Sequence, residues 1–269
     1  MRLLKKLYFS FLTTAGLLSR VTVPLRYTPD FTFFPLFLPL TGIFVTAVLT
    51  SLYAGLSFLG IKPSAAAALL LVFQYVLFNL FHFDGLLDSA DALLYRTTPE
   101  RRLAILKDKS AGSFAVFTGS IYLMAKFSFL TGLIRSVSGF SGLLFIFSYS
   151  TAGRIAGGMV PLLSSPAKEE GLGALLKNFQ KHLFLAGAVL AWAVTILSGS
   201  IFSEGSSVPV PAAASAALTA AVLCGALCAL IFNRKIGGFT GDAVGMAIEL
   251  GELSYLLVLF QMTGGAVHG

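Results

Sequence analysis

The chain has 269 residues, of which 56% are hydrophobic and 12% are charged, with a formal net charge of +7. Its mean hydropathy is +0.86. Soluble domains carry about twice this fraction of charged residues, so the composition excludes one or two ordinary soluble domains. The basic residues are scattered over short segments between apolar runs, which argues against a nucleic-acid partner and instead indicates a protein of the lipid bilayer.

The amino-terminal segment, residues 3–19, has a basic start followed by apolar residues, as signal peptides do. Thr13, Thr14 and Gly16 interrupt the apolar run, and no small-residue cleavage site precedes Arg20. We therefore expect this segment to be retained as an amphipathic helix that lies along the membrane interface.

Seven segments stay apolar for the roughly 20 residues that a helix needs to cross a bilayer core. These predicted spans are residues 31–59, 64–82, 113–134, 139–160, 182–202, 212–232 and 244–263. The connections are short and no linker is evident. The sequence thus predicts an all-α, polytopic transmembrane bundle that forms one integral membrane domain over residues 1–269, and it is compatible with a homo-oligomer.

The basic residues predict the orientation, because Lys and Arg concentrate on the cytoplasmic side of such proteins. With the amino terminus inside, Lys62 and Arg135 face outward, and Lys126 and Arg154 fall within spans. The other 15 of the 19 basic residues are cytoplasmic: Arg2, Lys5, Lys6, Arg20, Arg26, Arg96, Arg101, Arg102, Lys107, Lys109, Lys168, Lys177, Lys181, Arg234 and Lys235.

Three aspartates follow the second span in "FHFDGLLDSADALLYRTTPERRLAILKDKSAG", residues 81–112. If the helix continues, Asp84, Asp88 and Asp91 stand at i, i+4 and i+7 on one face. Like charges at this spacing repel each other, so a cation is expected, and oxygen ligands favour Mg²⁺ or Ca²⁺ over zinc. The alternative is a solvated helix end whose acids pair with nearby Arg and Lys.

A second acidic face occurs in "GGFTGDAVGMAIELGEL", where Asp242, Glu249 and Glu252 stand at i, i+7 and i+10. Carboxylates inside a membrane are energetically costly and usually functional. Both acidic faces reach the cytoplasmic boundary. Together they favour a metal site over two unrelated solvated faces.

The residues beside both acidic faces are those that a diphosphate would use. In "RRLAILKDKSAG", Arg101 and Arg102 offer bidentate contacts, Lys107 offers a point charge, and a small-residue turn at Gly112 can present N–H groups. The turn around Thr240 precedes a helix and can do the same. The pattern indicates phosphoryl transfer on a nucleotide-activated substrate. His82 is a candidate general base or phosphate contact, or else a packing residue.

The segments "HFDGLLDSADAL", "ERRLAILKDKSAGSFA" and "GGFTGDAVGMAIELGEL" closely resemble the signature motifs of the cobalamin synthases, the adenosylcobinamide-GDP ribazoletransferases. The segment "FLTTAGLLSRVTVP" is similar to the opening of that family. The resemblance implies a Mg²⁺-dependent, multi-pass enzyme of the inner membrane with its active site facing the cytoplasm. Such enzymes join adenosylcobinamide-GDP to α-ribazole or its 5′-phosphate, giving adenosylcobalamin or its 5′-phosphate, and release GMP.

The resemblance also implies roles for residues at the matching positions. It implies metal binding by Asp84, Asp88, Asp91, Asp242 and Glu249, with Asp84 and Asp88 at the reaction centre. The implied phosphate-side residues are Arg102, Lys107 and Asp108. In this hypothesis Mg²⁺ bridges the diphosphate, and His82 or an aspartate takes the proton of the attacking ribose hydroxyl.

Two other classes of protein remain as alternatives. CDP-alcohol phosphatidyltransferases also use clustered aspartates that begin with Asp-Gly, but they have Ala-Arg soon afterwards, where this chain has Leu87 and Asp88. A cation-coupled transporter would hold its acids near the bilayer midplane. The predicted position of the acids at the cytoplasmic edge favours an enzyme.

Overall fold

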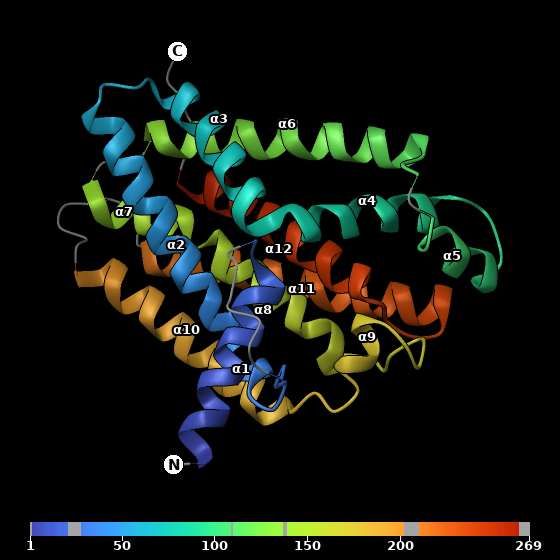
Figure 1. Cartoon of the computed structure of the whole chain (residues 1–269). Helices are drawn as coiled ribbons and strands as arrows, with labels where there is room; N and C mark the ends of the chain where they lie inside the picture. Colours follow the sequence, from blue (N-terminus) through green and yellow to red (C-terminus); the bar gives the residue numbers. More distant parts are fainter. Residues whose placement is uncertain (1, 21–27, 109, 137–138, 202–209, 264–269) are drawn as a thin grey trace.

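The computed structural model describes residues 2–20, 28–108, 110–136, 139–201 and 210–263, and these residues form helices and no strand. Figure 1 shows the arrangement. The helices are α1 (Arg2–Leu18), α2 (Phe34–Phe58), α3 (Pro63–Gln74), the π-helix η1 (Tyr75–Asn79), α4 (Leu80–Leu94), α5 (Pro99–Ile105), α6 (Ser113–Ser136), α7 (Gly139–Phe147), α8 (Tyr149–Leu163), α9 (Leu172–Leu175), α10 (Lys181–Ile201), α11 (Val210–Ile236) and α12 (Gly241–Met262).

Seven helical segments are long and apolar enough to cross a membrane, which confirms the predicted number of spans and the helical fold. The second span runs from Pro63 to Leu94, so the helix does continue through all three aspartates of the first acidic face. The fourth span is divided into α7 and α8. Exposed side chains recur along the outside of the bundle, for example Leu223, Leu227 and Leu230 on α11. An apolar outer surface of this kind is what a surrounding bilayer requires.

The second span changes direction at the π-helix η1, as the different courses of α3 and α4 in Figure 1 show. A π turn holds one more residue than an α turn and commonly occurs at functional sites. Here it directs Asn79 and Tyr75 towards α12, where both donate hydrogen bonds to Glu249. The carbonyl of Leu77 in η1 accepts a 2.7 Å hydrogen bond from the backbone N–H of Arg20. The end of α1 is thereby held against the second span.

Helix α12 packs against α4, α8 and α11. It crosses α4 at two glycines that lie backbone to backbone. A Cβ atom on Gly85 would lie 3.0 Å from the carbonyl oxygen of Asp242, and one on Gly245 would lie 2.9 Å from that of His82. Small residues at membrane-helix crossings allow such close approach. This crossing brings the two acidic motifs together.

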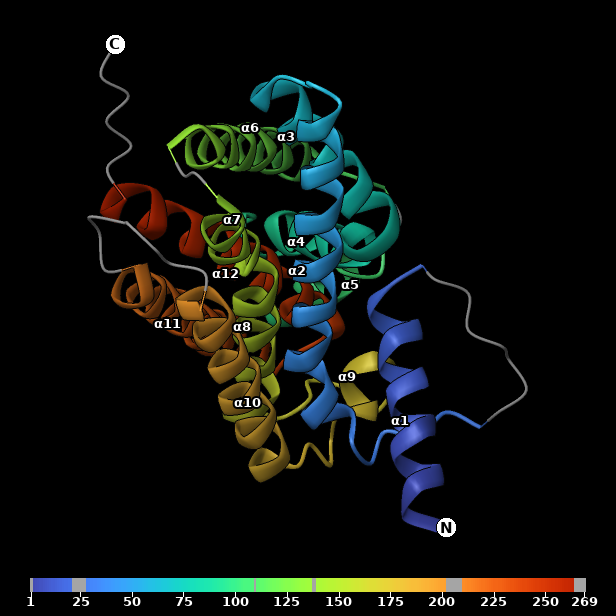
Figure 2. The same ribbon diagram turned by 90° about the vertical axis from the view of Figure 1, so that its left-hand side faces the viewer.

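Helix α1 is present as predicted and packs beside α2, at the edge of the bundle in Figure 2. Its buried face is polar: Ser10 donates to the carboxylate of Asp30 and accepts the N–H of Phe33. Its apolar side chains Leu3 and Leu4 are exposed. An outward apolar face fits contact with lipid, and the position of α1 along the interface stays a prediction.

The connections that carry the sequence motifs lie at one end of the bundle. In Figure 1, α5 and α9 are at the right, whereas the connection between α2 and α3 is at the upper left. The segment before α9 is joined to the turn between α11 and α12 by two backbone hydrogen bonds, Ala167 to Phe239 and Phe239 to Ser165, each 2.9 Å long. Three separate connections therefore meet beside the start of α12.

Candidate active site

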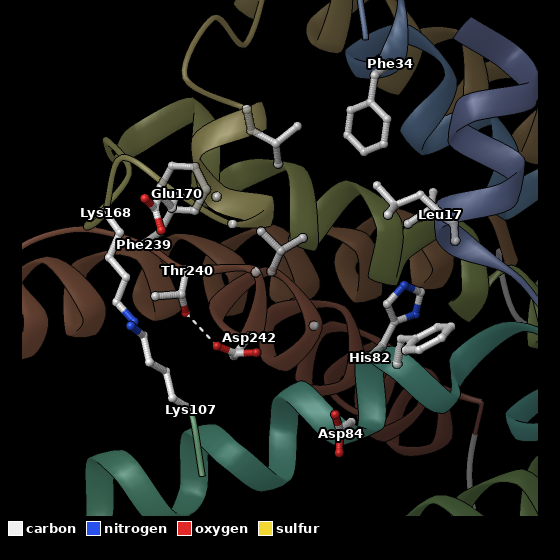
Figure 3. Close-up of a pocket in the computed structure, with 18 of the residues that line it drawn as sticks. Leu17, Phe34, His82, Asp84, Lys107, Lys168, Glu170, Phe239, Thr240 and Asp242 are labelled. Atoms are coloured by element: carbon white, nitrogen blue, oxygen red, sulfur yellow. Dashed lines mark hydrogen bonds between the residues drawn. The ribbon is translucent and has the colours of Figure 1, made fainter. Parts of the chain in front are cut away.

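A cavity of about 890 Å³ opens beside the start of α12 and is drawn in Figure 3. Its walls come from α1, the start of α2, α4, α9, α12 and the segment between α8 and α9. The charged residues that line it include Asp84, Asp242, Lys107 and Lys168. Its volume lies within the range of about 300–1,000 Å³ that is typical of small-molecule sites. The cavity is therefore the candidate site for a charged ligand.

The carboxylates of the first motif and Asp242 of the last motif form one acidic group. Asp84 and Asp242 line the cavity from α4 and α12. Asp88 is partly buried, and the negative charges that act on it are those of Asp84, Asp242 and Asp91. Thr240 donates a 3.0 Å hydrogen bond to the Oδ2 atom of Asp242. The predicted convergence of these two motifs is thus present in the structure.

Two lysines line the cavity near Asp242, as Figure 3 shows. Lys107 follows α5, and Lys168 lies in the segment before α9, where its Nζ atom is 3.4 Å from the carbonyl oxygen of Leu103. The pKa of Lys168 is below its ordinary value because the side chain is partly buried and because Lys107 is close by, while the charge of Asp242 acts in the opposite direction. Two neighbouring ammonium groups are a natural site for an anion with more than one charge.

Lys168 was absent from the residues predicted for the site. In the sequence it was one of several cytoplasmic lysines, in the stretch "SSPAKEEGLG", with no motif to distinguish it. Its neighbours Glu169 and Glu170 also line the cavity. The backbone pairing between Ala167 and Phe239 places this segment next to the start of α12. That pairing joins residues far apart in the chain, so no local pattern reveals it.

Asp91 and Gly112 have a structural contact with each other. The carboxylate of Asp91 accepts the N–H of Gly112 at 2.6 Å and the N–H of Ala115 at 3.0 Å, which satisfies free donors at the start of α6. A Cβ atom on residue 112 would lie 2.6 Å from Asp91 Oδ1. The N–H of Gly112 is therefore engaged by Asp91. The structure does not support the prediction that Gly112 contacts a phosphate.

Arg101, Arg102 and Asp108, the other predicted phosphate-side residues, lie away from the cavity. Arg102 is buried, and its guanidinium donates to the carbonyl of Ala92 near the end of α4. Arg101 is exposed, and its backbone N–H is 3.4 Å from the Thr98 side chain. Asp108 is exposed and accepts the N–H of Ser110 at 3.0 Å. None of the three lines the cavity. Arg102 instead fastens α5 to α4, which positions Lys107.

Glu249 belongs to a separate group inside the bundle. It lies seven residues after Asp242, about 10 Å further along the helix axis. Its carboxylate accepts hydrogen bonds from Tyr122 at 2.5 Å and from Tyr75 and Asn79 at 2.8 Å each. Glu249 is buried and is not among the residues that line the cavity, and its carboxylate is engaged by these three donors, so the predicted metal role does not fit it.

We call this group the buried charge network: Gln74, Tyr75, Asn79, Tyr122, Lys126, Tyr149, Arg154, Glu249 and Glu252. Glu252 pairs with Lys126 and with Arg154 at 2.6 Å each. Lys126 is also 3.5 Å from Glu249. Two acids and two bases balance, as buried charges require. The signal available in the sequence was the presence of two basic residues inside predicted spans.

His82 lines the cavity and is 6% exposed, with no hydrogen-bond partner for its Nδ1 atom in the described part of the chain. The position of His82 at the cavity wall agrees with the predicted contact to a ligand, and its role stays a prediction. Asp84 comes two residues after His82 in α4, so it lies on a different side of the helix, and it is exposed.

A magnesium ion fits the cavity only as part of a complex with a ligand. Within residues 2–263, outside the undescribed gaps, no three His, Cys, Asp or Glu side chains are placed to hold a metal by themselves. Mg²⁺ usually takes one or two protein carboxylates and fills its shell with water and substrate phosphates. Asp84 and Asp242, with Asp88 beside them, fit that kind of site.

These features define a multi-pass helical membrane protein with a cavity at one end of the bundle that is lined by lysines and carboxylates. Comparison with known proteins places it more narrowly. The chain belongs to the cobalamin-5-phosphate synthase family, whose model matches residues 10–260.

Several curated relatives carry the name adenosylcobinamide-GDP ribazoletransferase. The protein from Fervidobacterium nodosum is 32% identical over 204 residues, which are 76% of each chain. The one from Thermosipho melanesiensis is 29% identical over 254 residues, covering 93% of this chain and 98% of the relative. The one from Desulfitobacterium hafniense is 32% identical over 217 residues, or 74% and 75% of the two chains. No solved structure matches the chain.

Proposed function

We propose that the protein transfers the phosphocobinamide group of adenosylcobinamide-GDP to α-ribazole or α-ribazole 5′-phosphate. The products are adenosylcobalamin or its 5′-phosphate, together with GMP. The observation that carries this proposal is the cavity in which Lys107 and Lys168 converge with Asp84 and Asp242, in a chain of this family.

The two lysines are the groups that hold the diphosphate. Lys107 and Lys168 come from different segments, so they can contact non-bridging oxygens of both phosphorus atoms. Asp84 and Asp242 would repel a diphosphate if no cation lay between them. We therefore propose that Asp84 and Asp242, supported by Asp88, would hold a Mg²⁺ ion. Such an ion would neutralise the charge that develops on the leaving phosphate.

The reaction is a substitution at the phosphorus atom attached to cobinamide. The ribose hydroxyl oxygen of the acceptor forms the new P–O bond. The bond from that phosphorus to the bridging oxygen breaks, and GMP leaves with the bridging oxygen. The proton of the hydroxyl passes to one of the aspartates. Positioning and electrostatic stabilisation supply most of the catalysis in phosphoryl transfer.

We also propose that the protein lies in the plasma membrane, the inner membrane in cells that have two, with the cavity facing the cytoplasm. Lys107 and Lys168 line the cavity, and Arg234 and Lys235 end the helix that precedes the turn beside it. Clustered basic residues mark the cytoplasmic side. Both water-soluble substrates would then reach the cavity without crossing the bilayer.

The test is an assay of the purified full-length protein with adenosylcobinamide-GDP and α-ribazole, with and without Mg²⁺. We expect equal amounts of GMP and the corrinoid product, and loss of both when Mg²⁺ is chelated. A parallel reaction with a CDP-alcohol and a lipid acceptor tests the alternative class of membrane phosphotransferase. Product from that pair alone would overturn the proposal.

A further inference from the structure

The cavity has two chemically different ends. In Figure 3, Lys107, Lys168, Thr240 and Asp242 lie together at the left, whereas Leu17, Phe34 and His82 lie at the right. The charged end accounts for a diphosphate and its cation. A second part of a substrate must account for the apolar end.

Apolar side chains from α1, α2 and α12 line this end. Leu17 and Leu18 come from α1, Phe34 begins α2, and Val244 comes from α12. Helix α1 is held there by the hydrogen bond between Arg20, two residues after the helix ends, and the carbonyl of Leu77. This wall is therefore a fixed part of the site.

His82 is the polar side chain at this end that lacks a partner. It is 6% exposed, and its Nδ1 atom has no hydrogen bond within the described residues. Because Nδ1 is itself covered by protein, a ligand in the cavity would reach the imidazole through its other nitrogen, Nε2, which is not among the covered atoms and has no protein partner within the described residues.

The position of His82 on α4 separates it from the carboxylates. Residues two apart on a helix do not face each other, and Asp84 is exposed where His82 is buried. His82 therefore faces the apolar end, while Asp84 and Asp242 serve the charged end. This geometry favours ligand recognition by His82 over proton removal beside the diphosphate.

We propose that the apolar end binds the base of the acceptor nucleoside, and that an imidazole N–H of His82 donates a hydrogen bond to the unsubstituted ring nitrogen of that base. The inference rests on the proposed function and names the subsite for its acceptor. A benzimidazole-type base is an apolar double ring with one free acceptor nitrogen, which matches an apolar wall with one polar side chain. Guanine carries several donors and acceptors on its edges, and these would stay unpaired against Leu17 and Phe34.

The experiment compares two nucleosides on the full-length protein. One carries benzimidazole, and the other carries indole, in which a C–H group replaces the free ring nitrogen. Equilibrium binding of each is measured without the second substrate. We expect the indole nucleoside to bind about 10-fold more weakly, the usual scale for a lost buried hydrogen bond. In His82→Phe the two nucleosides should bind equally, whereas His82→Gln, which keeps an N–H donor, should retain part of the preference.

Steady-state kinetics separate recognition from catalysis. His82→Phe should raise KM for α-ribazole about 10-fold and leave KM for adenosylcobinamide-GDP and the pH profile of kcat unchanged. His182→Phe is the matched control, because His182 is exposed on α10. A preference for benzimidazole that survives in His82→Phe would overturn the inference, as would a fall in kcat with an unchanged KM for α-ribazole.

The binding comparison also separates this inference from the proposed function. If wild-type protein binds the nucleosides with the expected preference but forms no product, the subsite stands and the reaction is wrong. If product forms and wild-type protein does not distinguish the two nucleosides, the reaction stands and the role of His82 is wrong. A variant that fails to fold leaves the wild-type comparison intact.

Discussion

Aspartates that look alike in the sequence occupy two different kinds of position in the structure. Asp84 and Asp242 line the cavity, whereas Asp91 caps the start of α6. If Asp84 and Asp242 hold a substrate-bound cation, Asp84→Asn or Asp242→Asn should lower kcat about 100-fold or more. The thermal midpoint should change little. Activity of each variant is compared with that of Glu100→Gln, a change at an exposed acid on α5.

The alternative of a solvated acidic face makes the opposite prediction for the same variants. It expects turnover near that of the wild type, with stability changes within about 0.5 kcal/mol. Near-normal, Mg²⁺-dependent turnover in both variants would therefore show that Asp84 and Asp242 do not bind the cation.

Lys168 is the second residue whose role can be tested alone. Its ammonium group lines the cavity, so Lys168→Gln should raise KM for adenosylcobinamide-GDP by about 10-fold or more, the scale of a charge-assisted hydrogen bond. Lys177→Gln is the matched control, because Lys177 is exposed and lies outside the cavity lining. If the two variants had equal KM values for adenosylcobinamide-GDP, Lys168 would not contact the diphosphate.

At the scale of elements, the crossing of α4 and α12 decides whether the acidic group forms. A methyl group on Gly245 would lie 2.9 Å from the carbonyl oxygen of His82. Gly245→Ala should therefore separate the helices, lower stability by about 1–3 kcal/mol and reduce kcat. Gly55→Ala on α2 is the control, since a Cβ there meets nothing within 4 Å. Thermal unfolding and turnover of the two proteins should differ clearly.

The buried charge network joins α12 to the second span, to α6 and to α8. Lys126→Met removes one cation and leaves an excess negative charge, which should cost about 3–5 kcal/mol. Adding Glu249→Gln restores the balance, with Arg154 and Glu252 still paired at 2.6 Å. The double variant should therefore unfold at a higher temperature than Lys126→Met alone. A double variant no more stable than the single one would show that charge balance is not the stabilising factor.

At the scale of the whole molecule, the proposed function requires all the motif connections on one side of the membrane. Cysteines introduced at Arg96 and Lys235 should react with an impermeant thiol reagent from the cytoplasmic side, and one at Lys62 only from the opposite side. The physical reason is the excess of basic residues near Arg96 and near Lys235, because basic residues mark the cytoplasmic side. If the cysteines at positions 96 and 235 reacted from opposite sides of the membrane, the motifs could not form one active site.

Much of this architecture could be predicted because its signals are local. Apolar length gave seven spans, and the spacing of Asp84 and Asp88 placed them on one helical face. The positions of Glu249 and Asp91 could not be predicted in this way, because they depend on contacts between segments that are distant in the chain. Glu249 shares a face with Asp242, but spacing alone does not show that this face passes from the cavity into the network. Likewise, Asp91 becomes a cap only because α6 starts beside it.

The π-helix at Tyr75–Asn79 holds one residue more than a regular helix of the same length would need. Deleting Val76 would therefore let the segment continue as a regular α-helix, with Asn79 and Asp84 still pointing in nearly their present directions. A regular α-helix has no such extra residue. Deleting Met124 from α6 would rotate Lys126 relative to Tyr122 by about 100°, the angle between successive residues of an α-helix. In a random mutagenesis library, loss of codon 76 should thus leave far more activity than loss of codon 124.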